Sequence, residues 1–263
     1  MALVELTLFS PILTTDMEVN VILPQSMEKW AGPDGDLTGR CPTLYLLHGM
    51  SDDHSIWLRR TGIERYADEY GLAVVMPTTY LGFYTDMHMG EKYWQFISRE
   101  LPAALRSLFP QLSRKREDTF AAGLSMGGYG ALKCGLRAAD TFSWAAGLSS
   151  VADVAGLVKK PNLGTPAYWD DVFGPVEQVE GSFNDLLAAA EEMAKGDGPK
   201  TQFYMWCGTE DFLYAQNVKL RDHMQALGLP LTYEESPGNH QWVYWDQKIQ
   251  SVLRWLPLGK EVK

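Results

Sequence analysis

Cysteine is scarce in this sequence of 263 residues, which contains only three. Cys41, Cys134 and Cys207 are widely spaced and form no C-x-x-C pair. An odd number of cysteines in this arrangement indicates neither a disulfide framework nor a zinc knuckle. Because Cys134 and Cys207 lie within apolar segments, we expect them to be small residues of the core.

Long apolar runs and basic clusters are also missing. No uninterrupted apolar run approaches the roughly 18 residues that a membrane-spanning helix needs. The net charge is −10, and the basic triplet at 114–116 is followed at once by Glu117 and Asp118. We therefore expect neither a membrane nor a nucleic acid as a partner. The first ten residues lack the basic region of a signal peptide, which predicts a cytoplasmic protein.

Motifs for metals and cofactors are absent as well. His48 has acidic residues and a second histidine nearby, which raises the question of a metallo-hydrolase of the H-x-H-x-D-H type. That motif would require histidine at two positions where the sequence has Met50 and Asp53. The sequence also contains no H-E-x-x-H, no Gly-rich phosphate loop and no dinucleotide fingerprint. We expect no metal and no cofactor.

What the sequence does contain is a regular alternation of strand and helix patterns. Residues 3–9 and 18–23 alternate apolar with polar side chains, as half-buried antiparallel strands do. Short apolar runs, typical of parallel strands covered on both faces, occur at 43–47, 72–76, 120–124, 144–148 and 202–207. Helical patterns occur at 63–70, 93–109, 126–137, 217–227 and 242–256. This alternation predicts an α/β fold with a doubly wound, mostly parallel sheet.

Two segments interrupt the alternation. Residues 24–42 are rich in Gly, Pro and Asp and are expected to form a surface loop. Residues 152–200 are too long for a simple crossover and contain a helical pattern at 183–195. Such an insertion forms either a lid or pocket wall over the sheet edge, which we favour, or a surface excursion that does not contact substrate. No repeat or domain boundary is visible, so we expect one domain over 1–263.

The most informative segment is 118–132. Its apolar run leads into the turn Gly123-Leu-Ser-Met-Gly127, and a helical pattern follows. A G-x-S-x-G turn between a strand and a helix projects its serine above the sheet. The glycines are needed because the two backbones pass too close for a Cβ. The segment predicts that Ser125 is the nucleophile of an acyl-transfer reaction.

A nucleophilic serine needs a base and an acid that orients the base. In an elbow-containing fold these follow the serine in the order acid, then histidine. His223 lies in the middle of a helical pattern, whereas His240 lies in a turn between a strand-like run at 231–235 and the last helix. A loop at the end of a strand allows a base to reach Ser125, so we favour His240.

The acid and the oxyanion donors are expected at two further strand ends. Glu210 and Asp211 both follow the strand that ends near Gly208, and their spacing does not distinguish between them. The developing oxyanion needs backbone donors. We expect these to be the N–H groups of Met126, which follows the nucleophile, and Met50, which follows the strand at 43–47.

Aromatic residues are frequent in the segments that approach the predicted sheet edge. For any one of them, packing in the core is the more common role. Together they favour an apolar pocket for the acyl group, and we expect Trp57 and Trp94 to line it.

Several motifs in one order give the chain a family resemblance. They lie at 46–57, 60–65, 100–102, 123–131, 208–213 and 238–240. With these motifs the sequence resembles the esterase D family of α/β-hydrolases over nearly its whole length, and bacterial tributyrin esterases most of all. The resemblance implies that Ser125 is the nucleophile and His240 the base. The family's acid is the last carboxylate before Phe-Leu, which implies Asp211.

The resemblance also implies an activity. It indicates a serine carboxylesterase that hydrolyses short-chain acyl esters through an acyl-enzyme, with a small-molecule ester as its partner. It leaves open whether the chain forms a homo-oligomer. The alternatives are an S-formylglutathione hydrolase, a feruloyl esterase, an acyltransferase or a non-catalytic α/β-hydrolase. Formylglutathione hydrolases carry Ser-Gly-Leu-Thr-Cys where this chain has residues 48–52, His-Gly-Met-Ser-Asp, which favours an oxygen ester as substrate.

Overall fold

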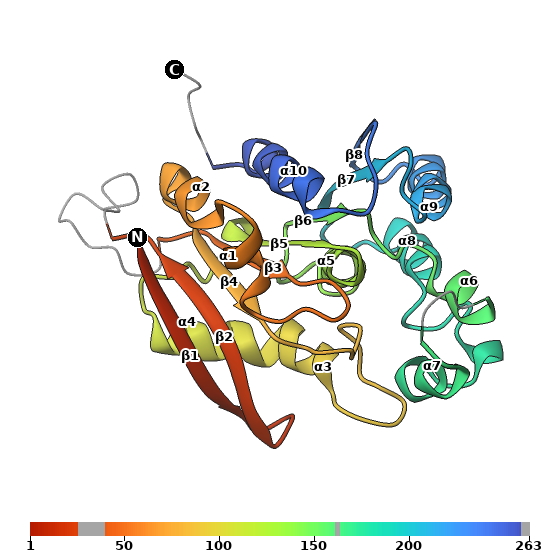
Figure 1. Ribbon diagram of the computed structural model, residues 1–263, viewed down its shortest axis with the longest axis horizontal. Coiled ribbons are helices and arrows are strands. Elements are labelled where there is room, and N and C mark those ends of the chain that lie inside the picture. Colours follow the sequence, from red (N-terminus) through yellow and green to blue (C-terminus); the bar gives the residue numbers. More distant parts are fainter. Residues whose placement is uncertain (26–39, 161–163, 259–263) are drawn as a thin grey trace.

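A single sheet organises the computed structural model, which describes residues 1–25, 40–160 and 164–258. Its strand order is β1-β2-β4-β3-β5-β6-β7-β8 (Figure 1). The strands are β1 (Ala2–Ser10), β2 (Thr15–Leu23), β3 (Thr43–Leu47), β4 (Ala73–Pro77), β5 (Thr119–Leu124), β6 (Trp144–Leu148), β7 (Gln202–Gly208) and β8 (Leu231–Ser236). The β1–β2 and β2–β4 pairs are antiparallel and the other pairs are parallel. The predicted α/β fold with a mostly parallel sheet is confirmed.

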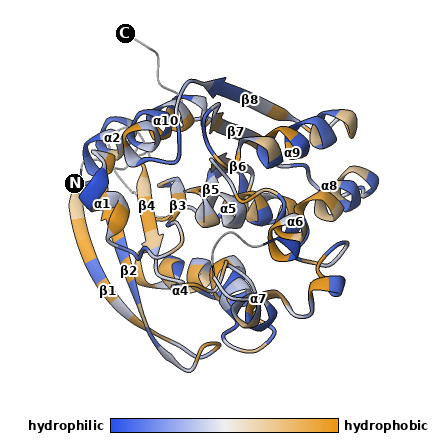
Figure 2. Ribbon diagram, turned by 45° about the vertical axis from the view of Figure 1, so that its right-hand side comes forward, coloured by the Kyte–Doolittle hydropathy of each residue, from blue (hydrophilic) through white to orange (hydrophobic). Residues whose placement is uncertain are grey.

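The central strands are buried on both faces because helices cover both sides of the sheet. Every residue of β3, β4 and β5 is buried. Side chains alternate along β3: Leu44 and Leu46 pack with α1 (Ile56–Arg60), α2 (Ile63–Tyr70) and α10 (Trp242–Trp255). Tyr45 and Leu47 pack on the other face with α4 (Leu101–Leu108), α5 (Met126–Arg137), α8 (Leu186–Lys195) and α9 (Tyr214–Ala226). Figure 2 shows β4 in hydrophobic colours and the edge strand β8 mostly in hydrophilic ones.

The helix predicted over 93–109 is present but irregular. It begins as α3 (Tyr93–Gln95), passes through a π-helical turn at Phe96–Glu100 and continues as α4. Within it the Ser98 hydroxyl donates a hydrogen bond to the Trp94 carbonyl at 2.7 Å. A hydroxyl that bonds to a carbonyl one turn back competes with the helix's own ladder, and the periodicity of apolar residues gives no sign of this interruption.

The insertion between β6 and β7 contains three α-helices and a 3-10 helix at Val176–Gln178 in its described residues. The α-helices are α6 (Val154–Lys159), α7 (Pro166–Phe173) and α8. The last begins at Leu186 rather than at 183 because the Asp185 side chain accepts a hydrogen bond from the Leu187 N–H and caps it. Of the loop predicted over 24–42, residues 26–39 lie outside the described part of the chain.

Strand order places one crevice at the middle of the sheet. The chain passes from β3 outward to β4 and then returns to β5 on the other side of β3. Loops after β3 and β5 therefore diverge at the carboxyl ends of these strands, the position where open α/β sheets bind ligands. Within residues 1–25, 40–160 and 164–258, none of the helices combines the length and apolar character that crossing a membrane requires.

Candidate active site

Ser125 lies in the turn between β5 and α5 in a conformation that is unusual for a residue with a side chain. Its φ is 54° and its ψ is −117°. A Cβ on Gly123 would lie 2.3 Å from the Gly127 carbonyl oxygen, and a Cβ on Gly127 would lie 2.3 Å from the Leu47 oxygen. Both neighbours are backbone atoms, so the two glycines are required for this approach of strand and helix. The turn therefore has the geometry of a nucleophile elbow.

Two hydrogen bonds connect Ser125 to the residues proposed as base and acid. His240 Nε2 lies 3.0 Å from Ser125 Oγ, and His240 Nδ1 lies 2.8 Å from Asp211 Oδ2. The other oxygen of Asp211 accepts the Leu213 N–H at 2.9 Å. Its side chain is 0 % exposed, whereas that of His240 is 21 % exposed and opens toward the cavity. The structure thus brings together the three residues that the sequence indicated.

Glu210, the alternative acid, has a different set of contacts. Its carboxylate accepts a hydrogen bond from the Gly238 N–H, and its own N–H donates to the Gly238 carbonyl at 2.9 Å. The bond from Gly238 holds the pKa of this carboxyl below its ordinary value. A Cβ on Gly208 would lie 2.2 Å from the Gly238 oxygen. Glu210 therefore joins the loop that carries Asp211 to the loop that carries His240.

The two expected oxyanion donors border the same space as Ser125. Met126 is the first residue of α5, so its N–H has no carbonyl one turn earlier in the helix to accept it. Met50 follows β3 across the crevice and, like Met126, lines the cavity in front of Ser125. Within the described residues the Met50 N–H makes no hydrogen bond. Both groups are thus available to a ligand oxygen.

His48 supports the loop that carries Met50. Its Nε2 accepts the Thr79 N–H at 3.0 Å, so the proton resides on Nδ1, which donates to the Gly49 carbonyl at 2.7 Å. Burial lowers the pKa of His48 to about 4, so the ring is neutral at pH 7. The Tyr84 hydroxyl donates to the His48 carbonyl at 2.8 Å. In the sequence, His48 could be considered only as a metal ligand, a role that the motif excludes. Its supporting role has no local signal, because its partners Thr79 and Tyr84 lie in the segment after β4.

A cavity of about 480 Å³ opens in front of Ser125. Small-molecule sites are typically concave, mostly apolar and of this size. Its lining residues are mostly apolar: Met50, Ser51, Leu81, Phe83, Ser125, Met126, Val151, Leu157, Gly164, Trp169, Phe212, Leu213 and His240. Leu157, Gly164 and Trp169 come from the insertion at 152–200, which therefore contributes to the wall of the cavity.

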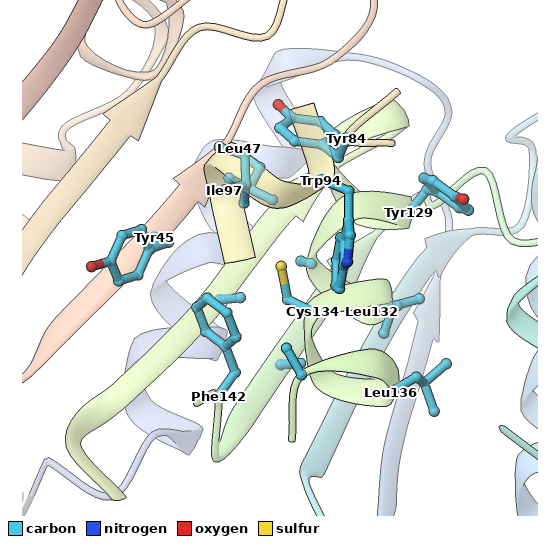
Figure 3. Packing of buried hydrophobic residues seen from close by; sticks show 14 of the residues in the cluster. Tyr45, Leu47, Tyr84, Trp94, Ile97, Tyr129, Leu132, Cys134, Leu136 and Phe142 are labelled. Atoms are coloured by element: carbon cyan, nitrogen blue, oxygen red, sulfur yellow. The ribbon is translucent and has the colours of Figure 1, made fainter. Parts of the chain in front are cut away.

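The expectation that Trp57 and Trp94 line this cavity is wrong. Trp57 is a residue of α1, and its side chain is buried in the core between the helices and the sheet. Its Nε1 donates to the Leu47 carbonyl at 3.0 Å, and its ring packs against Trp242. Trp94 packs beside α5 among the core side chains (Figure 3). Both rings are part of the hydrophobic core, the commoner fate of an aromatic residue. The aromatic wall of the cavity is formed instead by Phe83, Trp169 and Phe212.

Metal ligands do not cluster in the described part of the chain. No group of three or more His, Cys, Asp or Glu side chains there has a suitable arrangement. The two histidines near the crevice have other partners: His48 contacts Thr79, and His54 Nδ1 lies 2.8 Å from Thr78 Oγ1.

Comparisons with known proteins agree with this architecture. A family model described as "Putative esterase" matches residues 10–256. An acetyl esterase of Caldicellulosiruptor saccharolyticus is 33% identical over 97% of this chain and 98% of its own length.

Two solved structures from Staphylococcus aureus are similar over almost the full length of both chains. One is FphF, a fluorophosphonate-binding serine hydrolase in a substrate-bound form, with a TM-score of 0.89 and 33% identity over 98% of this chain and 99% of that one. The other is the apoenzyme of the S-formylglutathione hydrolase FrmB, with a TM-score of 0.86, 33% identity and the same coverage.

Proposed function

This chain belongs to the esterase family of α/β-hydrolases and is a serine hydrolase of carboxylic ester bonds; we propose that it hydrolyses short-chain acyl esters through an acyl-enzyme on Ser125. The observation that carries the proposal is the pair of hydrogen bonds from Ser125 through His240 to Asp211 at the floor of an apolar cavity.

In the proposed acylation step, Ser125 Oγ attacks the ester carbonyl carbon. His240 Nε2 takes the serine proton, and Asp211 stabilises the imidazolium by accepting its Nδ1–H. The carbonyl oxygen becomes an oxyanion that accepts the N–H groups of Met126 and Met50. When the tetrahedral intermediate collapses, the bond to the alcohol oxygen breaks, and His240 returns its proton to the leaving alcohol.

Deacylation repeats the sequence with water as the nucleophile. His240 takes a proton from a water molecule that attacks the acyl carbon, and the same two N–H groups hold the second oxyanion. The bond between the acyl carbon and Ser125 Oγ then breaks. His240 protonates the serine, and the carboxylic acid leaves. No step requires a group from outside the chain other than water and the ester.

The preference for short acyl chains rests on what closes the cavity. Phe83 packs edge-on against Trp169 at a ring-centroid distance of 5.3 Å, so the loop after β4 and the insertion meet across the cavity. Leu157 of α6 continues this wall. We propose that this part of the 152–200 insertion is a wall of the acyl pocket that limits the length of the acyl chain.

A series of p-nitrophenyl esters tests the proposal. With acyl groups from acetate to decanoate, kcat/KM is expected to be highest between acetate and butyrate and to fall toward decanoate. A steady rise toward decanoate with activation at a lipid interface would contradict the pocket assignment. Activity that Ser125→Ala retains in full would contradict the proposed nucleophile.

Thioester hydrolysis is the second candidate, and the likeness to FrmB favours it. The sequence of residues 48–52 differs from the Ser-Gly-Leu-Thr-Cys of formylglutathione hydrolases, which favours oxygen esters. Measuring kcat/KM for S-formylglutathione and p-nitrophenyl acetate with one enzyme preparation separates the two. We expect the oxygen ester to be preferred, and a clear preference for S-formylglutathione would assign the thioester activity instead.

A further inference from the structure

Lys133 carries a buried amino group that the proposed reaction does not use. It lies on α5 with 0% of its surface exposed. Its ammonium group donates hydrogen bonds to Thr85 Oγ1 at 2.9 Å and Asn184 Oδ1 at 2.6 Å, and it lies 3.4 Å from the Tyr84 carbonyl oxygen. Among the described residues, no carboxylate lies within ion-pair distance of it.

Aromatic rings complete the surroundings of this ammonium group. Its nitrogen lies 5.0 Å from the ring centroid of Trp94, 5.4 Å from that of Tyr129 and 5.3 Å from that of Phe183. Figure 3 shows Trp94 beside α5 and Tyr129 on that helix. Ring faces attract cations, but they do not replace the hydration that an ammonium group loses on burial. Burial accordingly lowers the pKa of Lys133 to about 7.

Stability alone does not explain a lysine at this position. Replacing buried charged groups by apolar residues of similar volume is often neutral or stabilising. A methionine of similar length would fill the same space without the loss of hydration. What a methionine would not provide is a donor to three oxygen atoms from two different segments. The specific contribution of Lys133 is therefore the arrangement of those segments.

The first of these segments is the wall loop, residues 78–86, which follows β4. Its Leu81 and Phe83 side chains line the cavity in front of Ser125. Three of its residues, Tyr80, Phe83 and Tyr84, have φ values of 47°, 48° and 49°. Such left-handed conformations are unfavourable for residues other than glycine and persist only when the surroundings hold them. Lys133 binds the two residues that directly follow Phe83.

The second segment is the part of the insertion around Asn184. The Asn184 side-chain oxygen accepts a hydrogen bond from Thr85 Oγ1 at 2.5 Å as well as from Lys133, so one atom links the insertion to both partners. The Tyr129 hydroxyl donates to the Asn184 carbonyl at 2.8 Å. Two residues before Thr85 in the wall loop, the Phe83 ring packs against Phe173 of α7 at a ring-centroid distance of 5.4 Å. Lys133 is thus the point where α5, the wall loop and the insertion meet.

We propose that Lys133 is a positioning residue that sets acyl-chain selectivity by holding the wall loop and Asn184 against α5. It touches neither Ser125 nor the cavity, and it acts through the placement of Leu81 and Phe83. The inference rests on the proposed ester hydrolysis at Ser125.

The test compares Lys133→Met with Lys92→Met, the same substitution at an exposed lysine. The readout is the ratio of kcat/KM for p-nitrophenyl butyrate to that for p-nitrophenyl octanoate, measured together with the thermal midpoint. We expect the ratio to fall about tenfold in Lys133→Met, mainly through KM, which is less than the roughly 10² lost when a positioned group moves by 1 Å, because Lys133 acts on the wall and not on Ser125. The thermal midpoint should stay the same or rise. Lys92→Met should leave the ratio and the midpoint unchanged.

Asn184→Ala provides a second route that does not alter the core, since Asn184 is only half-buried. Asn184→Ala should also lower the ratio of butyrate to octanoate activity. The double variant of Lys133→Met and Asn184→Ala should show less than the sum of the two effects, because both residues act through the hydrogen bond between them. If Lys133→Met does not fold, Asn184→Ala alone decides the matter. A ratio unchanged in Asn184→Ala and in folded Lys133→Met, with Ser125→Ala inactive, would overturn this inference and leave the proposed function intact. Full activity of Ser125→Ala would instead overturn the proposed function.

Discussion

The three turns that carry Ser125, Asp211 and His240 are built differently from the wall of the cavity. Backbone holds the turns together: a Cβ on Gly127 or Gly208 would collide with a carbonyl oxygen of another segment. Side chains do more of this work in the wall, where Lys133, Asn184 and the rings around Phe83 join the wall loop to the insertion. Backbone hydrogen bonds to the insertion occur just beyond the wall loop, from His88 and Met89 to α7.

This difference separates two properties of the proposed enzyme. Backbone contacts between neighbouring strand ends leave little freedom, so they fix the distances on which the chemistry depends. Side-chain contacts between distant segments tolerate substitution with partial rearrangement, so they are suited to setting which acyl chain fits. Changes in the first region should abolish or strongly reduce kcat, whereas changes in the second should alter selectivity or stability.

The largest effect is expected for Ser125→Ala. Removing the hydroxyl removes the covalent route, and loss of the nucleophile in a serine protease lowered kcat by about 10⁶. Esterase activity on p-nitrophenyl butyrate should fall close to the uncatalysed rate. Circular dichroism should show an unchanged fold. Substantial remaining activity would mean that the backbone-held turns do not contain the nucleophile.

Asp211→Asn should follow in size. Asparagine does not stabilise the imidazolium as a carboxylate does, and the equivalent change in a serine protease lowered kcat by about 10⁴. We expect a loss of similar order with little change in folding stability.

Glu210→Gln is the matched control for Asp211→Asn, because glutamine retains an oxygen that accepts the Gly238 N–H. Its activity should stay within about tenfold of the parent, since a neutral hydrogen bond replaces a charge-assisted one outside the reacting groups. The reverse ranking in steady-state kinetics would assign the acid to Glu210.

Gly208→Ala tests the backbone contact itself. The new Cβ would lie 2.2 Å from the Gly238 oxygen, so the loop that carries His240 must move. A displacement of about 1 Å at a positioned group lowers rates by about 10², and we expect a loss of that order in kcat. Gly198→Ala is the control, because a Cβ there meets nothing within 4 Å. Equal activity of the two variants would show that the chemistry does not depend on this contact.

The last effect concerns the pH dependence of stability at the wall. The pKa of Lys133 is about 7 in the folded protein, against 10.5 for an ordinary lysine. At pH values between these two, Lys133 is protonated in the unfolded chain and largely unprotonated in the folded protein. The unfolded chain therefore binds up to one more proton, and the free energy of unfolding rises with pH by up to about 1.4 kcal/mol per pH unit. Asp86 and Cys134 raise this pKa and Arg137 lowers it.

Urea unfolding of the parent and Lys133→Met at pH 7 and pH 9 measures this contribution. The stability of the parent relative to the variant should increase between the two pH values, since methionine does not titrate. A difference that is independent of pH would show that the buried amine keeps an ordinary pKa.

Much of the fold could be predicted from the sequence because its signals are local. Each strand of the sheet was expected within a few residues of its position, since runs such as 43–47 and 120–124 reflect burial on both faces. The sequence does not reveal α1 and α6, which have five and six residues, too few to show a periodic pattern. It does not reveal α7 either, because Pro166, Gly164 and Gly174 make that segment resemble a loop. The three residues selected at strand ends are those that the structure brings into hydrogen-bonding contact.

The rest of the site depends on contacts between distant segments. The spacing of Glu210 and Asp211 does not indicate which of them is the catalytic acid. The direction of each side chain depends on how the loop that carries them contacts Gly238, which the sequence does not show. Trp57 and Trp94 were expected in the cavity because a sequence shows that a residue is aromatic but not which way its ring points. The sequence does not indicate that Lys133 is buried or what it binds, because its partners Thr85 and Asn184 come from separate parts of the chain.

Labelling with a fluorophosphonate tests the central claim, that Ser125 is the nucleophile, most directly. Trypsin cleavage after Arg116 and Lys133 releases the peptide 117–133, in which Ser125 is the only serine. After reaction with one equivalent of reagent, mass spectrometry should find the phosphonyl group on this peptide in a ratio of one per chain, with activity lost in proportion. The Ser125→Ala protein should remain unlabelled. Stoichiometric labelling of any other peptide, or loss of activity without label on 117–133, would contradict the account.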